Sequence, residues 1–211
     1  MTQSISIQGQ TFVMHPSGAL YWLEQQLLLI SDVHLGKVMH FRKHGVAVPM
    51  HPIAKNFLQL DAAVDYFRPE SIVFLGDLFH SKKNAEWEMF ADWVSQTDAR
   101  IILVAGNHDI IDQKHYEDLG IAVGNEWLIG VFLLTHHPEE REGFFNFSGH
   151  LHPGIELRGS GRQSLKLPCF FRKPNQMILP AFGTFTGRYY LVPTEHDCVF
   201  AIANAEVVVV C

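Results

Sequence analysis

The chain has 211 residues, of which 47% are hydrophobic and 18% are charged, and its formal net charge is −6. This composition is typical of a globular protein, and it excludes a disordered chain and a protein that coats nucleic acid through general positive charge. The sequence contains no apolar run of about 18 residues, so it predicts no membrane-spanning helix.

The N-terminal residues and the cysteines bear on the compartment. The first residues, MTQSISIQGQ, show neither the basic stretch nor the apolar stretch of a secretory signal. Cys169, Cys198 and Cys211 are widely spaced and match neither a disulfide framework nor a zinc ribbon. Because free thiols are typical of a reducing compartment, we expect a cytoplasmic protein.

The first half of the sequence alternates strand-like and helix-like segments. Three short apolar runs each end in Gly or Ser followed by Asp, Asn or His: LLLISDVHLG (27–36), SIVFLGDLFH (71–80) and ARIILVAGNHD (99–109). Between them, residues 51–70 and 84–97 repeat apolar residues with the helical period, so each predicts a helix with one buried face. This order implies parallel strands with crossover helices, and such sheets bind ligands at the carboxyl ends of their strands.

The second half predicts a second sheet. Short apolar strands joined by turns cover residues 127–138, 143–152, 164–173, 176–187 and 198–210. The sequence NAE at 204–206 predicts a tight hairpin turn within the last of them. We expect this sheet to be at least partly antiparallel and to pack on the first. The sequence shows no linker between the halves, so residues 1–211 are expected to form a single α/β domain.

Five segments place metal-capable side chains at predicted strand ends. They are 32–34, Asp77, 107–109, His136–His137 and 150–152. Alternate residues of an extended segment point the same way, so Asp32 with His34, and His150 with His152, are each expected to aim at one point. Glycines beside these residues let the backbone turn sharply and approach a bound ion closely.

The mixture of ligand types indicates which metals fit. Carboxylate, imidazole and one amide oxygen, without thiolate, suit Mn²⁺, Fe or Zn²⁺. The candidate ligands are too many for one ion: Asp32, His34, Asp77, Asn107, His136, His150 and His152. Two ions bridged by one carboxylate accommodate them, and two ions about 3.5–4 Å apart are a recognised catalyst of displacement at phosphorus.

The order of the motifs resembles that of a known enzyme family. D-x-H, G-D, G-N-H-D, H and G-H-x-H follow one another as in the calcineurin-like metallophosphoesterases. The segments SDVHLGK, GVAVP, GDLFHSK, HHPE, LPCF and LPAFGTFTG further resemble the bacterial ligase-associated DNA damage response endonucleases, from about Ile30 to Gly187. The resemblance implies a sandwich of two β-sheets flanked by helices, in four layers ordered αββα.

The resemblance also implies a role for each site residue. One metal ion takes Asp32, His34 and His152, the other takes Asn107, His136 and His150, and Asp77 bridges them. His108 is then no ligand but faces the substrate and protonates the departing oxygen. The implied activity is Mn²⁺-dependent hydrolysis of phosphodiester bonds, by a DNA endonuclease that cuts single-stranded DNA in DNA repair alongside a DNA ligase and a helicase-like protein.

Three neighbouring residues have open roles. The second motif is often G-D-x-x-D in the family, but here its last position is His80, which either plays a different part or hydrogen-bonds a ligand. The fourth motif offers two histidines, and His136 is favoured over His137 because it comes first after the strand. We expect His80, Asp109 and His137 to lie just outside the ligand set.

Basic residues are candidates for substrate binding. Lys37, Arg42 and Lys43 follow the first motif directly, and Arg158 and Arg162 can extend a cationic track for phosphates. A solvated turn is an equally good interpretation of the basic loop, and a scatter over several faces explains the other charges equally well.

Nucleic acid also needs surfaces on which bases can stack. Candidates in the sequence are Phe41, Phe170, Phe171 and Phe185, although core packing is the favoured interpretation of each. The window 143–188 has a formal charge of +5, while the rest of the chain has −11. Charge is therefore segregated along the sequence, which allows a local basic site, although a scatter of these residues over different faces is an equally good interpretation.

Two other functions remain open. A phosphatase or pyrophosphohydrolase acting on a nucleotide or a lipid-linked phosphate can use the same ligands, although the sequence shows no insertion that would form a lipid-binding lid. A catalytically silent metal-binding scaffold would not need all seven ligand positions. Oligomeric state, native metal and strand preference are not determined by the sequence.

Overall fold

A mixed sheet carries the strands predicted in the first half. The protein is described by a computed structural model that places residues 1–37, 51–159, 161, 163–184 and 186–210. The strand order is β1 (Gln3–Ile7), β2 (Gln10–Met14), β3 (Leu20–Trp22), β4 (Leu27–Ile30), β5 (Ser71–Leu75), β6 (Arg100–Val104) and β7 (Ala122–Gly124). β1 to β4 form an antiparallel meander, whereas β4 to β7 are parallel. The prediction of three parallel strands is confirmed by β4, β5 and β6.

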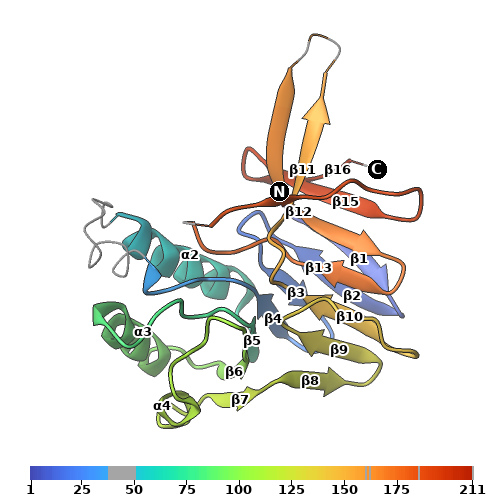
Figure 1. Ribbon diagram of the computed structural model, residues 1–211. Coiled ribbons are helices and arrows are strands. Elements are labelled where there is room, and N and C mark those ends of the chain that lie inside the picture. Colours follow the sequence, from blue (N-terminus) through green and yellow to red (C-terminus); the bar gives the residue numbers. More distant parts are fainter. Residues whose placement is uncertain (38–50, 160, 162, 185, 211) are drawn as a thin grey trace.

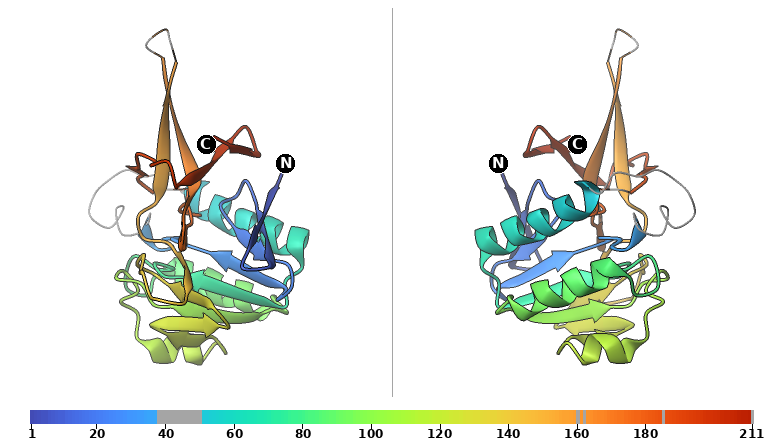
Figure 2. Two further views of the ribbon diagram at one scale, coloured as in Figure 1. Left: turned by 90° about the vertical axis from the view of Figure 1, so that its right-hand side faces the viewer. Right: turned by 90° about the vertical axis from the view of Figure 1, so that its left-hand side faces the viewer.

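Among the described residues, three helices cover one face of this first sheet (Figures 1 and 2). They are α2 (His51–Phe67), α3 (Ala85–Ser95) and α4 (Gln113–Glu117). The apolar faces of the longer two pack on the parallel strands, since Leu60 and Phe90 share a buried cluster with Phe74 and Leu103. Both predicted helices are thereby confirmed.

The second sheet is also mixed. Its order is β14 (Tyr189–Tyr190), β11 (Pro153–Arg158), β12 (Ser164–Lys173), β13 (Gln176–Ile178), β10 (Phe145–Ser148), β9 (Phe132–Thr135) and β8 (Glu126–Ile129). β15 (Cys198–Ala203) pairs with β12 and with β16 (Glu206–Val209). Asn204 and Ala205 have φ of 49° and 60°, the left-handed backbone that a tight hairpin needs, so the predicted turn is confirmed.

The two sheets pack face to face. Leu29 and Leu75 of the first sheet lie in one buried cluster with Phe147 and Phe170 of the second. Phe171, the next residue of β12, is buried on the opposite face, so core packing is confirmed for both phenylalanines. Phe41 and Phe185 lie outside the described residues. The expected α/β sandwich of two sheets is confirmed.

The outer face of the second sheet differs from that of the first. It carries a smaller cluster that includes Ile155, Cys169 and Phe171, with Leu151 and Leu191 packed against it. Within the described residues every helix lies on the first sheet, so the layers run helix, sheet, sheet, and the expected outer helical layer is not found there. Strands β11 and β12 extend beyond the body as a projecting hairpin (Figure 1). No helix among the placed residues is both long and apolar enough to cross a membrane.

Candidate metal centre

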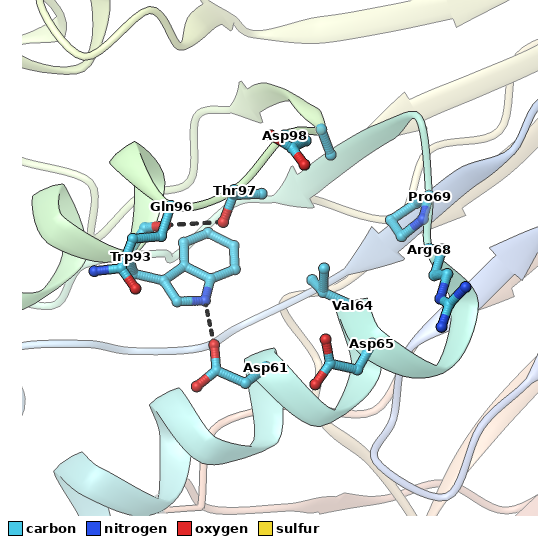
Figure 3. A pocket seen from close by; sticks show the side chains of 10 residues that line it. Asp61, Val64, Asp65, Arg68, Pro69, Trp93, Gln96, Thr97 and Asp98 are labelled. Atoms are coloured by element: carbon cyan, nitrogen blue, oxygen red, sulfur yellow. Dashed lines mark hydrogen bonds between the residues drawn. The ribbon is translucent and has the colours of Figure 1, made fainter.

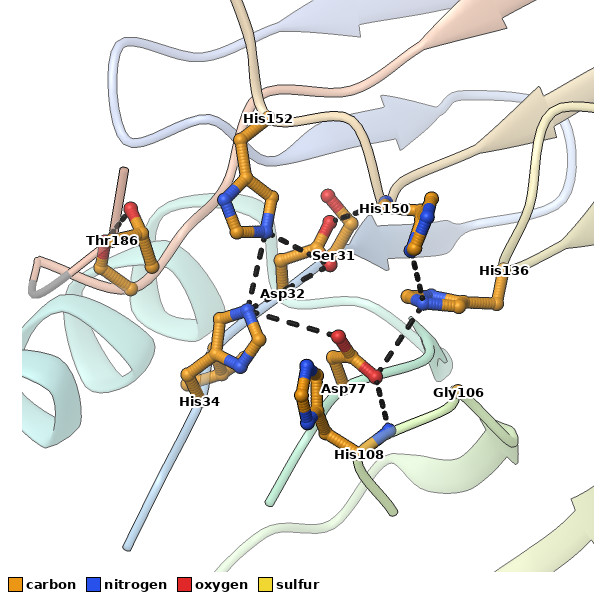
Figure 4. A network of polar contacts seen from close by, with 12 residues as sticks. Ser31, Asp32, His34, Asp77, Gly106, His108, His136, His150, His152 and Thr186 are labelled. Carbon is orange, nitrogen blue, oxygen red and sulfur yellow. Dashed lines mark hydrogen bonds and ion pairs between the residues drawn. The ribbon is translucent and has the colours of Figure 1, made fainter. Parts of the chain in front are cut away.

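The expected ligands gather at the carboxyl ends of β4, β5 and β6, where loops from the second sheet join them (Figure 4). Loops after β4, β5, β6, β9 and β10 supply Asp32, His34, Asp77, Asn107, His136, His150 and His152. The first sheet therefore supplies the carboxylates, and the second sheet supplies imidazoles only.

Asp32, His34 and His152 form a first group. The Nε2 atom of His152 lies 3.1 Å from Nε2 of His34 and 3.3 Å from Oδ1 of Asp32. Asp32 is fully buried and His34 is 6% exposed. His152 Nδ1 donates to the Gly187 carbonyl over 3.1 Å, so in the neutral ring Nε2 faces the group as a lone pair.

Asn107, His136 and His150 form a second group. His136 Nε2 lies 3.0 Å from Oδ1 of Asn107 and 3.1 Å from Nδ1 of His150. His136 Nδ1 donates to the Leu75 carbonyl over 2.9 Å, which again leaves Nε2 free of a proton in the neutral ring. A carbonyl behind the imidazole is the usual way in which a metal-binding histidine is oriented.

Asp77 lies between the two groups. Its Oδ1 is 3.4 Å from Nε2 of His136, and its Oδ2 is 3.8 Å from Nε2 of His34. Its side chain is buried, and Oδ1 also accepts the backbone N–H of His108 over 2.9 Å. One carboxylate oxygen thus faces each group, as a bridging ligand requires.

His150 and His152, in the segment GHLHPG (149–154), do not aim at one point. His150 joins His136, whereas His152 joins Asp32, so the expectation drawn from alternate residues of an extended segment is wrong for this pair. The reason is the backbone: φ is 68° at His150 and 48° at His152, in the left-handed region. Asp32, His34 and Asp77 share this conformation, with φ of 54°, 53° and 50°.

Glycines beside the ligands permit close packing. A Cβ on Gly149 would collide with Oδ2 of Asp32, and a Cβ on Gly106 would collide with the backbone N and Oδ1 of Asp77. The Asp32 oxygen instead accepts the backbone N–H of His150 over 2.9 Å. These glycines allow loops of different strands to meet around the carboxylates, which agrees with the close backbone approach expected from the sequence.

The donor set fits divalent metal ions. Ligand atoms of a tetrahedral site with bonds of about 2.0–2.1 Å lie about 3.3 Å apart. The closest contacts between ligand atoms here are 3.0–3.4 Å. Among the described residues, the buried Oδ1 of Asp32 has no hydrogen-bond partner, although buried carboxylate oxygens normally have one. Because these oxygen and nitrogen lone pairs point at one another without hydrogen-bond donors between them, a bound cation would stabilise the arrangement.

The imidazoles differ in how readily they take up a proton. Burial, with further contributions from His152 and Lys37, lowers the pKa of His34 to about 2. Burial and the neighbouring His137 also lower the pKa of His150. Burial opposes protonation of His152 as well, but the neighbouring Asp32 carboxylate outweighs burial and raises the pKa of His152. Neutral imidazoles are the form that metals bind.

His136 and His137 occupy different positions. His136 is 3% exposed and faces Asp77, whereas His137 is exposed and its ring centroid lies 3.9 Å from that of His150. Nitrogen atoms of both histidines and of His150 lie within 4.8 Å of one another. The contact with the central carboxylate favours His136 as the ligand.

His108 and its neighbours lie beside the ligands. The ring centroid of His80 lies 4.2 Å from that of His108 and 5.3 Å from that of His34, so His80 packs against both a ligand candidate and the expected acid. Asp109 accepts the backbone N–H groups of Phe79 and Gly106 over 2.9 and 2.8 Å. Burial raises its pKa to about 6. Asp109 thereby joins the loops that carry Asp77 and His108.

One supporting residue is not apparent in the sequence. Glu86, in the first turn of α3, is 2% exposed, and its Oε2 accepts the backbone N–H of Gly36 over 2.7 Å. Asn84, which caps α3, and Ser81 also contact Gly36 through its carbonyl. The start of α3 thus holds the turn that follows His34, and only the fold brings these distant residues together.

Of the expected substrate-binding residues, the structure describes Lys37 and Arg158. Lys37 lies close enough to the centre to lower the pKa of His34, and burial lowers its own pKa against the opposing effect of Asp77. Arg158 is exposed on β11 and pairs with Glu156 over 3.3 Å. Arg42, Lys43 and Arg162 lie outside the described residues.

A separate hollow lies beside α2 and α3 (Figure 3). It measures about 480 Å³ and lies between α2 and the segment after α3, with Asp61, Asp65 and Asp98 in its lining. Trp93 donates its indole N–H to Asp61 over 2.9 Å. It contains none of the candidate ligands.

The family model of the calcineurin-like phosphoesterases matches residues 26–169. The chain therefore belongs to this family, and it is a metal-dependent phosphoesterase. Over its full length, and over the full length of the other chain, it is similar to a nuclease named MPE from Pseudomonas putida, with a TM-score of 0.81 and 27% sequence identity. The sequence matches none of the curated proteins compared with it.

Two further solved structures are more distant. A protein of unknown function, AQ665 from Aquifex aeolicus, is 18% identical with a TM-score of 0.46, covering 60% of this chain and 78% of the other. Yfce, a phosphoesterase from E. coli, is 15% identical with a TM-score of 0.38, covering 84% and 88%. Neither similarity is close enough to inform the function.

Proposed function

We propose that this protein is a dinuclear, Mn²⁺-dependent phosphodiesterase that cuts single-stranded DNA internally. The observation that carries the proposal is the position of Asp77, which directs one oxygen toward each of two ligand groups. Asp32, His34 and His152 hold one ion in this proposal, and Asn107, His136 and His150 hold the other. When bound, the two cations supply an activated water and stabilise charge on the phosphoryl oxygens.

The chain's own residues orient and protonate the substrate. His108, held beside Asp77 through its backbone N–H, donates a proton to the departing oxygen. His80 packs against its ring and limits its rotation. Lys37, beside the centre, offers positive charge to a phosphate, and Arg158 offers it farther out on the projecting hairpin.

Two considerations favour nucleic acid as the substrate. The full-length similarity is to a protein described as a nuclease. The sequence motifs also resemble the ligase-associated DNA damage response endonucleases. We therefore place the enzyme in DNA repair in the cytoplasm, with a DNA ligase and a helicase-like protein as partners and residues 1–211 as a single domain.

The test begins with chelator-treated protein to which Mn²⁺ is restored. Its substrates are bis-(p-nitrophenyl) phosphate, p-nitrophenyl phosphate and a labelled single-stranded oligonucleotide. We expect Mn²⁺-dependent hydrolysis of the diester and internal cuts in the oligonucleotide. Hydrolysis of the monoester with an intact oligonucleotide would replace the proposal with a small-molecule phosphatase. Two bound metals with no activity on any substrate would indicate the scaffold.

A further inference from the structure

A second, smaller hollow of about 290 Å³ adjoins His152. Helix α2 contributes Lys55 to its wall, and the segment before β14 contributes Thr184, Thr186 and Arg188. Of the described residues that line it, Lys55 and Arg188 are cationic and none is acidic. Because His152 belongs to the metal centre, a phosphate bound in this hollow would lie next to the reacting one.

The wall of this hollow is held by hydrogen bonds from α2. Asn56, 5% exposed, accepts the backbone N–H and the hydroxyl of Thr184, each over 3.1 Å. Gln59 donates its amide to the carbonyls of Ser17 and Phe182 over 2.9 and 3.1 Å. The backbone N–H of Phe182 in turn donates to Ser31, beside Asp32, over 2.9 Å. The hollow is therefore a built part of the fold, connected directly to the first ligand motif.

Two exposed tyrosines follow the hollow along the chain. The backbone N–H of Tyr189 donates to the His152 carbonyl over 3.0 Å, and its side chain is 62% exposed. The Tyr190 ring packs on Gly154, and Lys166 Nζ lies 4.9 Å from its centroid. Among the described residues, Tyr66 is the other tyrosine with a largely exposed ring, and it lies on α2. Of the three exposed tyrosines among the described residues, two therefore follow the hollow beside His152.

We propose that the hollow and Tyr189 bind the nucleotide next to the scissile phosphodiester of a single-stranded nucleic acid. Lys55 and Arg188 contact its phosphate, and Tyr189 stacks on its base. A cationic hollow without acids attracts phosphate, and an open aromatic ring stacks on any base. The inference rests on the proposed function and adds to it which surface binds the strand.

The experiment compares Mn²⁺-loaded wild type with Tyr189→Ala, Tyr189→Phe and the double variant Lys55→Ala/Arg188→Ala. Tyr66→Ala is the matched control, since it removes an equally exposed ring far from the centre. Each protein is assayed on a single-stranded oligothymidylate, on the same strand with abasic sites, and on bis-(p-nitrophenyl) phosphate. The readout is kcat/KM for each strand divided by kcat/KM for the small diester.

We expect Tyr189→Ala to lower this ratio about tenfold for the strand with bases and to leave it unchanged for the abasic strand. Tyr189→Phe keeps the ring and should restore the ratio. The double variant should lower the ratio for both strands. It should also reduce the slope of log affinity against log salt by about 0.7 for each phosphate that the protein no longer neutralises.

The outcomes separate this inference from the function on which it rests. If wild type cuts the strand but every variant retains the ratio of Tyr66→Ala, the subsite is wrong and the endonuclease remains. An effect of Tyr189→Ala that is equal on both strands would overturn the stacking role. Hydrolysis of the diester by wild type with an intact strand would refute the nuclease itself, before any variant is compared.

Discussion

The first sheet has a hollow at each of its ends, and the two differ in almost every respect. At the amino ends of β5 and β6 lies the larger one, about 480 Å³, with three aspartates and Arg68 in its lining. At the carboxyl ends lies the smaller one, about 290 Å³, which has no acid among its described lining residues and adjoins His152. Size alone would select the wrong end of the molecule.

The difference lies in what the polar groups do. At the amino end, Asp61 accepts the indole N–H of Trp93 and so takes part in an ordinary structural hydrogen bond. At the carboxyl end, imidazole and carboxylate lone pairs face one another, and the buried Asp32 Oδ1 lies 3.3 Å from His152 Nε2 without a hydrogen-bond donor among the described residues. Convergent acceptors without donors, rather than volume, distinguish a binding site from a gap between helices.

The largest expected effect comes from Asp77→Asn at the carboxyl end. The amide cannot offer a charged oxygen to both groups, so we expect both ions to be lost or weakened and turnover to fall on the order of 10³-fold. Metal content by mass spectrometry and hydrolysis of the small diester measure this. Metal at 100 times its Kd should also raise the free energy of unfolding of wild type by about 2.7 kcal/mol, and it should not stabilise the variant in this way. A variant with full metal content and near-normal turnover would contradict the bridging role.

His108→Asn separates chemistry from metal binding at the same end. The backbone N–H that reaches Asp77 is unchanged by this substitution. We expect metal content to stay near that of wild type and turnover to fall by about 10²–10⁴-fold with a poor leaving group. Diesters with better leaving groups should show a smaller loss, because they need less protonation. Loss of metal from this variant would refute its assignment as the acid.

Glu86→Ala tests a support that lies outside the ligand set. It removes the acceptor of the Gly36 N–H, and we expect metal affinity to fall by about tenfold or more. Glu88→Ala is the control, because Glu88 is exposed on the same helix. Metal titration of both variants gives the comparison. Equal affinities in the two variants would show that the turn after His34 holds its shape without Glu86.

Asp61→Ala changes the opposite end and should have the smallest effect. The substitution removes the hydrogen-bond partner of Trp93, which is 8% exposed. We therefore expect the free energy of unfolding to fall by about 1 kcal/mol and Tm to fall by about 2–4 °C. Phosphodiesterase activity should be that of wild type at temperatures below the transition. A fall in turnover without a fall in stability would show that the two ends are coupled.

The sequence predicts well what depends on local periodicity and strand ends. β4, β5, β6 and the two longer helices follow from apolar patterns, and the rule for parallel sheets brings Asp32, Asp77 and Asn107 to one edge. The convergence of the second-sheet histidines on that edge agrees with the family resemblance. These parts need no knowledge of long-range geometry, because each strand carries its polar residues directly after its apolar run.

Long-range partners could not be predicted in the same way. The division of His150 and His152 between the groups depends on left-handed backbone that an extended pattern does not contain. The contact between Glu86 and Gly36 joins residues 50 positions apart, and Gln59 reaches Phe182 across 123 positions. The stacking candidates in the sequence include Phe170 and Phe171, which the fold buries, whereas Tyr189 and Tyr190 are exposed near the centre. Exposure is decided by which strands neighbour one another, and one strand's sequence does not specify that.

The left-handed conformation of five candidate ligands has a consequence for protein engineering. Such a conformation costs a residue other than glycine about 1 kcal/mol or more, so the five together cost several kcal/mol, comparable with the net stability of many domains. The packed sheets must supply that energy before any metal binds. Copying the seven side chains onto a smaller scaffold would therefore transfer the ligands without the means to hold their backbone, and a miniature of this enzyme would need most of the sandwich.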